Sequence, residues 1–400
     1  MARATDSAAP AAAAAPPSTV PDVDDLAVLR ASPFAEQVVE LTNLLSQSKR
    51  AFVIGAGCSK CAGLPLMEEL TTKVLEGLPK DGKAHSILTG LKKHFDGANG
   101  CTIEDYMSEL VDHLAIAERR RLRSATAANA SINETDYNPD DLAQSLIEIK
   151  NTIAAVIDGA KKTISVHRQF VRAIHHVLQL GKAGPSAPAD YYTLNYDTLF
   201  EDALSLERIP LADGFNGGAT GWWDASAYRD SSAQARILKV HGSIDWCLWD
   251  SDVLPRRVRQ GLDVDGKREP VLIWPASTKY REAQRDPFAQ IIDTMRRGLR
   301  PTSDSQVVLT ICGYSFGDAH VNVELDRALR ESEGLTIIAF TNEDEPQGQL
   351  KEWRGDASVC DQVRIYANKG FFHGKFEERS DTALPWWRFE VLTRLLGGER

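Results

Sequence analysis

The stretch AFVIGAGCS, residues 51–59, decides the fold class of this chain. Its apolar half predicts a short buried strand, and Gly55 and Gly57 predict a tight turn whose backbone approaches a ligand closely. Pro65 and the acidic residues after it suit the first turn of a helix. A strand, a glycine turn and a helix N-terminus together form a Rossmann-like phosphate cradle. A G-x-G turn alone is weak evidence, because plain strand-to-helix turns also use it.

Short apolar runs rich in β-branched residues recur along the chain and alternate with helical spacing of apolar residues. The expected strands span residues 50–54, 191–194, 236–240, 271–274, 307–311 and 336–340. The expected helices include residues 35–47, 287–297 and 321–331. This alternation predicts an α/β fold with a Rossmann-like open, mostly parallel sheet and helices on both faces.

Two polar residues follow one of these strands directly, in the run TLNYD at 193–197. Asn195 and Asp197 therefore lie where α/β sheets place their ligands. The Asn195 amide has both a donor and an acceptor, so it can hold a water or a ribose hydroxyl in a fixed orientation. Asp197 is equally suited to cap the helix that begins near Thr198.

A histidine ends another expected strand, in the run HGS at 241–243. An imidazole with a pKa of about 6.5 can exchange a proton at cellular pH, which makes His241 a candidate for proton transfer. The alternative is a core histidine bonded to a backbone carbonyl. His320 is a second candidate, although the run D-x-H-x-N at 318–322 is more simply explained as ordering the helix that follows.

The glycine turn, TLNYD and HGS together resemble the NAD-binding core of the sirtuin family, in the order that family uses. TLNYD is similar to the sirtuin T-Q-N-I-D, with Asn195 and Asp197 retained. The run GYSFGD at 313–318 is similar to the G-T-S-L turn that meets the ribose of the adenosine half. It also narrows the resemblance to bacterial sirtuin-like proteins of anti-phage defence. The resemblance covers residues 50–322, interrupted by a helical block.

The resemblance implies roles for individual residues. The implied cofactor contacts are Gly55, Ala56, Gly57, Ser59, Asn195, Asp197, Gly313 and Ser315, and the implied catalytic residues are Asn195, His241 and Asp197. NAD is then a substrate that is cleaved to nicotinamide and ADP-ribose, depleting NAD in abortive infection. Asn195 orients the attacking water, His241 transfers a proton, and Asp197 adds electrostatic support.

Two departures from the family separate this chain from sirtuin deacylases. Those enzymes usually carry a zinc ribbon, which needs four ligands in two close pairs. The chain has one C-x-x-C, at 58–61, and four solitary cysteines, so we expect no zinc and predict no metal ligands. The family's G-I-P-x-F-R is replaced by GLPLME at 63–68, which lacks the arginine, and Tyr196 replaces an apolar residue. An NAD-dependent protein deacylase and a non-catalytic NAD or ADP-ribose sensor are the alternative functions.

The domain organisation follows from the positions of the motifs. We expect a disordered tail at 1–24, a sirtuin-like NAD-binding core at 25–74 and 190–345, a helical insertion at 75–189, and a C-terminal extension at 346–400 that packs on the core. The polar, Asn-rich stretch at 126–139 predicts a loop or linker. Residues 365–372 predict a strand, and the aromatic run at 386–389 predicts a terminal helix.

The composition excludes several classes of function. The net charge of −10 argues against sequence-independent binding of nucleic acid, and we interpret the basic clusters at 119–123 and 256–259 as solvated faces or protein contacts. No apolar run approaches the roughly 20 residues that cross a bilayer. The Ala- and Pro-rich residues 1–21 lack a secretory apolar core, although a transit peptide is an alternative. Six cysteines without a disulfide pattern agree with a reducing compartment, so we expect a cytoplasmic protein.

The implied activity also has consequences for partners. A cell cannot leave NAD cleavage switched on, so we expect the protein to be held off by assembly or to await a trigger. Related systems pair a stand-alone protein of this kind with a HerA-type ATPase or a short Argonaute. We therefore expect a homo-oligomer, a separate defence partner such as a HerA-type ATPase, no direct nucleic-acid contact and no membrane contact. The helical insertion is large enough to provide such an interface.

Overall fold

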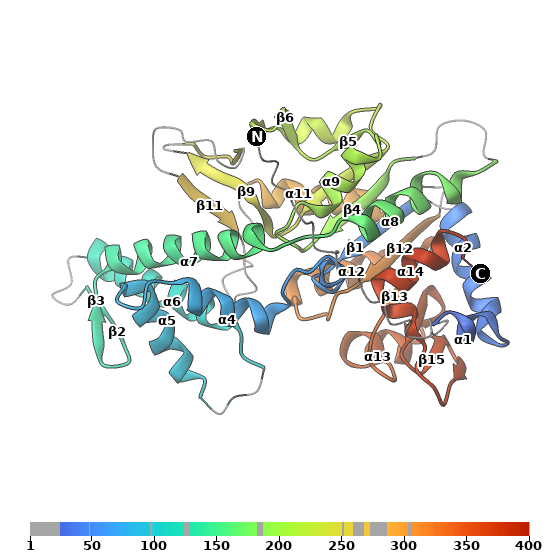
Figure 1. The fold of residues 1–400 in the computed structure, drawn as a ribbon, viewed down its shortest axis with the longest axis horizontal. Helices are drawn as coiled ribbons and strands as arrows, with labels where there is room; N and C mark the ends of the chain where they lie inside the picture. The colour runs from blue at the N-terminus through green and yellow to red at the C-terminus, as the bar shows by residue number, and fades with distance from the viewer. Residues whose placement is uncertain are drawn as a thin grey trace, which may run out of the picture.

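A nine-stranded sheet forms the centre of the molecule (Figure 1). The computed structural model describes residues 25–399 except 48, 97, 99, 124–127, 182–186, 250–251, 259–267, 273–285 and 303–305. The strand order is β16-β15-β14-β13-β12-β1-β4-β8-β5. The strands span β1 Lys49–Ile54, β4 Ala189–Thr193, β5 Leu211–Ala212, β8 Ala235–Lys239, β12 Val307–Cys312, β13 Leu335–Phe340, β14 Val363–Ala367, β15 Gly370–His373 and β16 Phe376–Arg379. Every pair from β5 to β14 is parallel, which confirms the predicted α/β class.

Strand β1 lies at the point where the chain changes direction across the sheet. From β1 the chain continues to β4 and β8 on one side, and it later returns to β12, β13 and β14 on the other side. Open α/β sheets bind ligands at the carboxyl ends of the strands beside such a switch point. The strand order alone therefore places a candidate site after Ile54, Thr193 and Cys312.

Helices cover both faces of the sheet, and strand β1 is therefore buried on both sides. Phe52 and Ile54 belong to the core under α1 Ala27–Arg30, α2 Phe34–Gln47, α8 Ser165–His175, α9 Leu199–Leu206 and α14 Phe389–Leu396. Ala51 and Val53 belong to the core under α11 Phe288–Leu299, α12 Ala319–Glu331 and α13 Gly348–Gly355. Short 3-10 helices, η1 Val177–Gln179, η2 Ala225–Arg229, η3 Cys360–Gln362 and η4 Pro385–Trp387, complete the connections.

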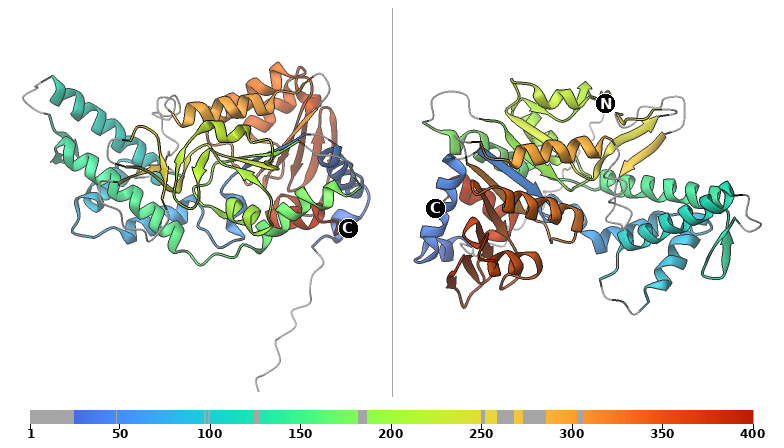
Figure 2. Two further views of the ribbon diagram at one scale, coloured as in Figure 1. Left: turned by 90° about the horizontal axis from the view of Figure 1, so that it is seen from above. Right: turned by 180° about the vertical axis from the view of Figure 1, so that it is seen from behind.

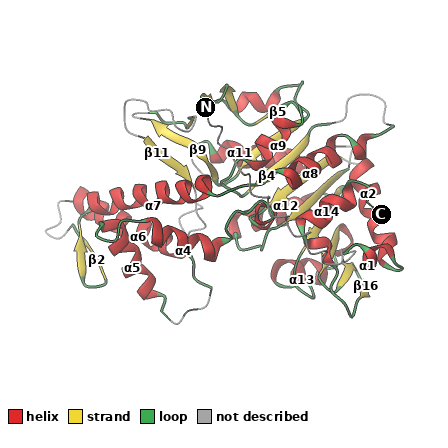
Figure 3. Ribbon diagram, in the orientation of Figure 1, coloured by secondary structure: helices red, strands yellow, loops and turns green. Residues whose placement is uncertain are grey.

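A helical arm projects from the sheet between β1 and β4 in sequence (Figures 2 and 3). It contains α4 Met67–Gly77, α5 Lys83–His94, α6 Ile103–Leu122 and α7 Pro139–Gly159, packed around a core of their own. The expected loop at 126–139 is wrong for its described part, which forms a hairpin of β2 Ala130–Ile132 and β3 Thr135–Tyr137. Asn133 and Glu134 make its turn with φ values of 48° and 65°. Such a two-residue turn with positive φ matches the twist of paired strands.

A second, antiparallel sheet packs beside α7, in the order β11-β9-β10-β7-β6. Its strands are β6 Phe215–Gly217, β7 Gly221–Trp223, β9 Gly242–Trp249, β10 Arg256–Arg257 and β11 Arg268–Leu272. The strand expected at 271–274 therefore begins earlier and belongs to this sheet, with residues 273 and 274 outside the described part. A short apolar run fits any buried strand, so its pairing partner depends on tertiary contacts.

The C-terminal segment extends the central sheet. The single strand expected at 365–372 is instead two antiparallel strands, β14 and β15, and β16 continues at the edge. The terminal helix α14 begins at Phe389, the last residue of the aromatic run, whereas Trp386 and Trp387 lie in η4 and Trp386 is fully buried. The proposed domain boundaries remain predictions. No helix in the described ranges is long and apolar enough to span a membrane.

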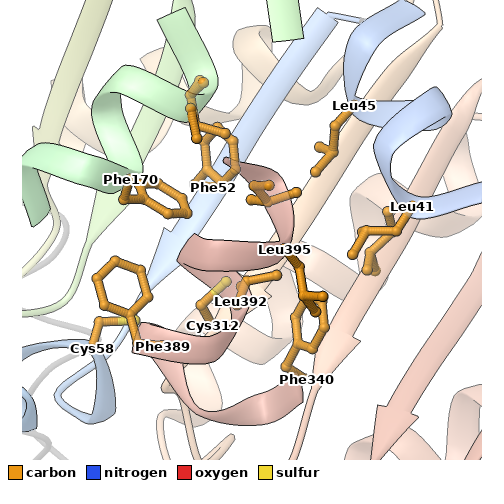
Figure 4. Close-up of a cluster of buried hydrophobic side chains, with 14 of the residues drawn as sticks. Leu41, Leu45, Phe52, Cys58, Phe170, Cys312, Phe340, Phe389, Leu392 and Leu395 are labelled. Atoms are coloured by element: carbon orange, nitrogen blue, oxygen red, sulfur yellow. The ribbon is translucent and has the colours of Figure 1, made fainter. Parts of the chain in front are cut away.

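The aromatic contacts of β1 give a test of this core. Phe52 is fully buried, stacks on Tyr191 with ring centroids 5.2 Å apart and meets the edge of Phe170 at 5.4 Å (Figure 4). We expect Phe52→Ala to lower the free energy of unfolding in urea by about 3–5 kcal/mol, because it leaves a cavity between strand and helices. The control Phe376→Ala removes the same side chain from a position that is 50% exposed, and should cost about 1 kcal/mol. Equal losses would contradict this description of the core.

Candidate functional site

A cavity of about 220 Å³ opens at the carboxyl ends of β1, β4, β8 and β12. Eight of the nine residues predicted for the site line it: Gly55, Ala56, Ser59, Asn195, Asp197, His241, Gly313 and Ser315. Gly57 is not among the lining residues. Four motifs that are far apart in the sequence therefore meet at one place, because four neighbouring parallel strands end there.

Two backbone loops touch each other at the base of the cavity. The Gly57 N–H donates to the Gly313 carbonyl at 2.9 Å, and the Gly55 N–H donates to the Cys312 carbonyl at 2.9 Å. A Cβ atom on Gly55 would lie 2.3 Å from the Gly313 oxygen. A Cβ atom on Gly313, whose φ is +62°, would lie 2.5 Å from the Cys58 nitrogen. The glycines are therefore needed for contact between loops, and Gly57 has this role instead of lining the cavity.

Most backbone N–H groups of the glycine turn donate to carbonyl groups of the protein and are not available to a ligand. Cys58 N–H donates to the Gly55 carbonyl and Ser59 N–H donates to the Ala56 carbonyl, both at 3.0 Å. The N–H groups of Gly55 and Gly57 are also used, so within residues 55–59 only the Ala56 N–H makes no hydrogen bond to the described chain. A single helical turn, α3 Gly57–Lys60, follows directly, and the helix expected after Pro65 is α4, which begins at Met67. Within residues 55–59 the Ala56 N–H is therefore the backbone donor that remains for a ligand, and the phosphate cradle itself stays a prediction.

The orientation of Asn195 is set by its amide nitrogen. Asn195 Nδ2 donates to the Gly55 carbonyl at 3.0 Å and to Ser59 Oγ at 2.8 Å. A backbone carbonyl only accepts, so the nitrogen must face Gly55 and both of its hydrogens are used. The oxygen Oδ1 is then the atom of Asn195 that can accept from a water or a sugar hydroxyl.

Ser59 and Asp197 continue this chain of hydrogen bonds. Ser59 Oγ accepts from Asn195 and donates to Asp197 Oδ2 at 2.7 Å. Asp197 Oδ1 accepts from the Leu199 N–H at 3.0 Å, in the first turn of α9. Asp197 therefore caps α9, as one of the two sequence interpretations proposed, and the Ser59 hydrogen is used within the protein. Both residues position Asn195.

His241 presents one nitrogen to the cavity. Its Nδ1 lies 3.2 Å from the Leu194 carbonyl, which can only accept, so Nδ1 has the hydrogen and Nε2 of the neutral ring has the lone pair. The ring belongs to a residue that is 3% exposed. Gly242 follows with φ +80°, and a Cβ there would lie 2.1 Å from the Val271 carbonyl oxygen. The glycine of HGS thus lets β9 pass close to β11.

His320 points at His241, which the sequence did not show. The two Nε2 atoms are 3.4 Å apart, and Asp318 Oδ1 is 4.0 Å from His241 Nε2. The run at 318–322 was expected to order the helix that follows it. Asn322 has this role, and His320 does not. Tyr314 Oη donates to Asn322 Oδ1 at 2.9 Å, and Asn322 Nδ2 donates to the Phe316 carbonyl at 2.8 Å.

The helical arm also contributes to the cavity. Glu104 of α6 and Ile157 of α7 line it, together with Leu64 and Met67 from the segment after the glycine turn. No sequence motif marks Glu104 and Ile157, because they reach the site only through the packing of the arm against the sheet, whereas Leu64 and Met67 lie in GLPLME. The spacing of apolar residues identified their helices but not the direction in which each residue points.

A buried ion pair supports the segment between Asn195 and α9. Lys239 is 1% exposed, donates to the Asp197 carbonyl, and lies 3.4 Å from Glu201 Oε1. Burial raises the pKa of Glu201 to about 7, partly opposed by the positive charge of Lys239. The carboxyl group therefore holds its proton to a higher pH in the folded protein than in the unfolded chain.

One family model matches part of the chain. Residues 189–359 match the family model described as "SIR2-like domain". The match includes the motifs around Asn195, His241 and Gly313, whereas the glycine turn at 55–59 precedes it. It supports a sirtuin-like family, as the resemblance of the motifs suggests.

The other comparisons add little. No curated protein matches the chain. Among solved structures, a mutant of a Sir2 homologue in complex with ADP-ribose has 12% sequence identity and a TM-score of 0.37, over 89% of this chain and 94% of that chain. A TM-score this low does not establish a common fold.

The contact between the two loops predicts intolerance of side chains at the glycine turn. We expect Gly55→Ala to lower the free energy of unfolding by about 1–3 kcal/mol, because the added Cβ overlaps the Gly313 carbonyl. Gly159→Ala is the matched control, since its Cβ would meet no described atom within 4 Å. That control should be neutral or slightly stabilising in the same urea titration. A neutral Gly55→Ala would show that the loops do not touch.

The pKa of Glu201 predicts a pH dependence of stability. As pH rises from 4.5 toward 7, the unfolded chain loses this proton before the folded protein does. The wild type should therefore lose up to about 3 kcal/mol of unfolding free energy relative to Glu201→Gln over this window. Urea titrations of both proteins across the window measure the difference, in which the other carboxylates cancel. A constant difference would contradict the raised pKa.

Proposed function

We propose that this protein is an NAD glycohydrolase, which cleaves NAD to nicotinamide and ADP-ribose. The observation that carries the proposal is the meeting of Asn195 and His241 in one cavity beside the glycine turn. Asn195 has an oriented amide and His241 has an oriented imidazole, and neither bears a permanent charge. Such a pair can aim a water molecule and remove its proton, whereas nothing in the pair can act as a covalent nucleophile of the serine or cysteine type.

The reaction needs little acid catalysis, because nicotinamide leaves as a neutral molecule from a cationic ring. The bond between nicotinamide and the ribose breaks toward an oxocarbenium-like state, as in glycoside hydrolysis. Asn195 Oδ1 accepts a hydrogen bond from the attacking water, and His241 Nε2 accepts the proton that the water loses. The products are nicotinamide, ADP-ribose and one proton. Leu64, Met67 and Leu194 line the cavity and restrict other water molecules.

The small volume of the cavity supports the proposal that the enzyme is inactive until the cavity is opened. Sites for small molecules usually have volumes of about 300–1,000 Å³. The cavity here has about 220 Å³, so a whole dinucleotide requires movement of its lining. Part of that lining comes from the arm, with Met67 of α4 and Ile157 of α7, and Leu64 precedes the arm in sequence. We propose that assembly or a partner, such as a HerA-type ATPase in anti-phage defence, opens the cavity through the arm.

The deacylase alternative receives less support. In the segment at 63–68, where the family has G-I-P-x-F-R, Glu68 stands in the place of the family's arginine. Its neighbour Met67 lines the cavity. The sensor alternative shares the site but predicts binding without turnover, so one assay separates it from the proposal.

The decisive assay is nicotinamide release from NAD by the purified full chain, tested alone and with the candidate partner. We expect Asn195→Ala and His241→Ala each to reduce the rate by about 100-fold or more, because each removes one part of the water-activating pair. Lys351→Ala, at an exposed position of α13 and not among the residues that line the cavity, is the folded control. Equal rates in all proteins would contradict the site, and tight NAD binding without release under every condition would favour a sensor.

A further inference from the structure

Three side chains converge beside the cavity, which His241 and Asp318 line, and two of them have no role in the proposed hydrolysis. They are His241 after β8, and Asp318 and His320 at the start of α12. The potential ligand atoms of all three lie within 4.8 Å of one another. We propose that these three residues form a binding site for a divalent transition metal ion, best matched by Zn²⁺, and that metal binding there inhibits NAD cleavage.

The separation of the two imidazoles agrees with a shared metal ion. Zinc–nitrogen bonds of about 2.0–2.1 Å at tetrahedral angles place two ligand nitrogens about 3.3 Å apart. The Nε2 atoms of His241 and His320 are 3.4 Å apart. Asp318 Oδ1 lies 4.0 Å from His241 Nε2 and within 4.8 Å of the His320 ligand atom, so a shift of about 1–2 Å completes a third position. The two histidines and one carboxylate leave the fourth position for water.

The surroundings of His241 also suit a ligand. A metal-binding histidine almost always donates its other ring N–H to a carbonyl or carboxylate, which fixes the ring. His241 Nδ1 donates in this way to the Leu194 carbonyl. The side chains of His241 and Asp318 are only 4% and 11% exposed, so a metal ion that binds them displaces little bound water. Nitrogen ligands favour zinc and its neighbours over Mg²⁺ and Ca²⁺.

The consequence for activity rests on the proposed function. A metal ion at this site takes the lone pair of His241 Nε2, the atom that accepts the proton from the attacking water. NAD cleavage and metal binding then compete for the same atom. The binding of the metal itself depends only on the geometry of the three ligands, so the two claims can be tested separately.

A second cluster on the arm has to be removed before metal binding is measured. His94, Glu109 and His113 of α5 and α6 also place their ligand atoms within 4.8 Å, at a more exposed position. The reference protein is therefore His113→Ala, and the test protein is His113→Ala with His320→Ala. Binding of Co²⁺ by visible absorption, displaced by Zn²⁺, is the readout. We expect the reference to bind one Co²⁺ with nitrogen and oxygen ligands, and the test protein to bind it about 100-fold more weakly or worse.

Two controls make the outcome decisive. Asp318→Asn, in the same His113→Ala background, should weaken Co²⁺ binding without removing a ring, so a folding defect specific to His320→Ala cannot mimic the result. Equal Co²⁺ affinity in reference and test proteins, or a cobalt–thiolate charge-transfer band, would overturn the metal site. In the active wild type Zn²⁺ should abolish nicotinamide release and a chelator should restore it. Binding without inhibition would overturn the regulatory claim, whereas the absence of any NAD cleavage would overturn the proposed function and leave the metal site standing.

Discussion

The contact between the loops that follow β1 and β12 is the constraint on which the rest of the site depends. These strands are hydrogen-bonded neighbours, with Ile54 beside Cys312, so the two loops leave the sheet at the same level. Gly55 and Gly313 have no side chains, and their backbones therefore meet directly. This contact forms the base of the cavity and positions the Gly55 carbonyl that orients Asn195. A side chain at either glycine would push the loops apart.

A continuous series of hydrogen bonds leads from that contact to the N-terminus of α9. The Gly55 carbonyl, the Asn195 amide, the Ser59 hydroxyl and the Asp197 carboxylate are joined in sequence, and Asp197 then holds the first turn of α9. Each member satisfies its neighbour, so the chain is stable although it is buried. The result is a site made of rigid, oriented groups, and the buried Lys239 and Glu201 pack against the segment that carries Asp197. Rigid, oriented groups suit a reaction whose main requirement is one well-placed water molecule.

Much of the site could be predicted from the sequence because its residues lie at strand ends. The apolar runs before Gly55, Asn195, His241 and Gly313 identify buried strands, and parallel strands bring their carboxyl ends to one edge. The position of Gly57 and the internal use of the N–H groups could not be predicted, because they depend on which loop packs against the turn. The direction of His320 was also missed, since a residue in the first turn of a helix can face the site or the solvent.

By itself the sequence determined the α/β class, the strands around which the site forms, and the residue types that meet there. These properties follow from apolar periodicity and from the restricted conformations of glycine, both of which act over a few residues. Only the tertiary structure decided that β11 joins a separate antiparallel sheet, that residues of the arm line the cavity, and that Asp197 and Ser59 position Asn195. These outcomes depend on contacts between segments that are separated in the sequence, such as the 2.7 Å hydrogen bond from Ser59 to Asp197 across 138 positions. Local patterns do not encode such contacts, because many pairings bury the same apolar surface equally well.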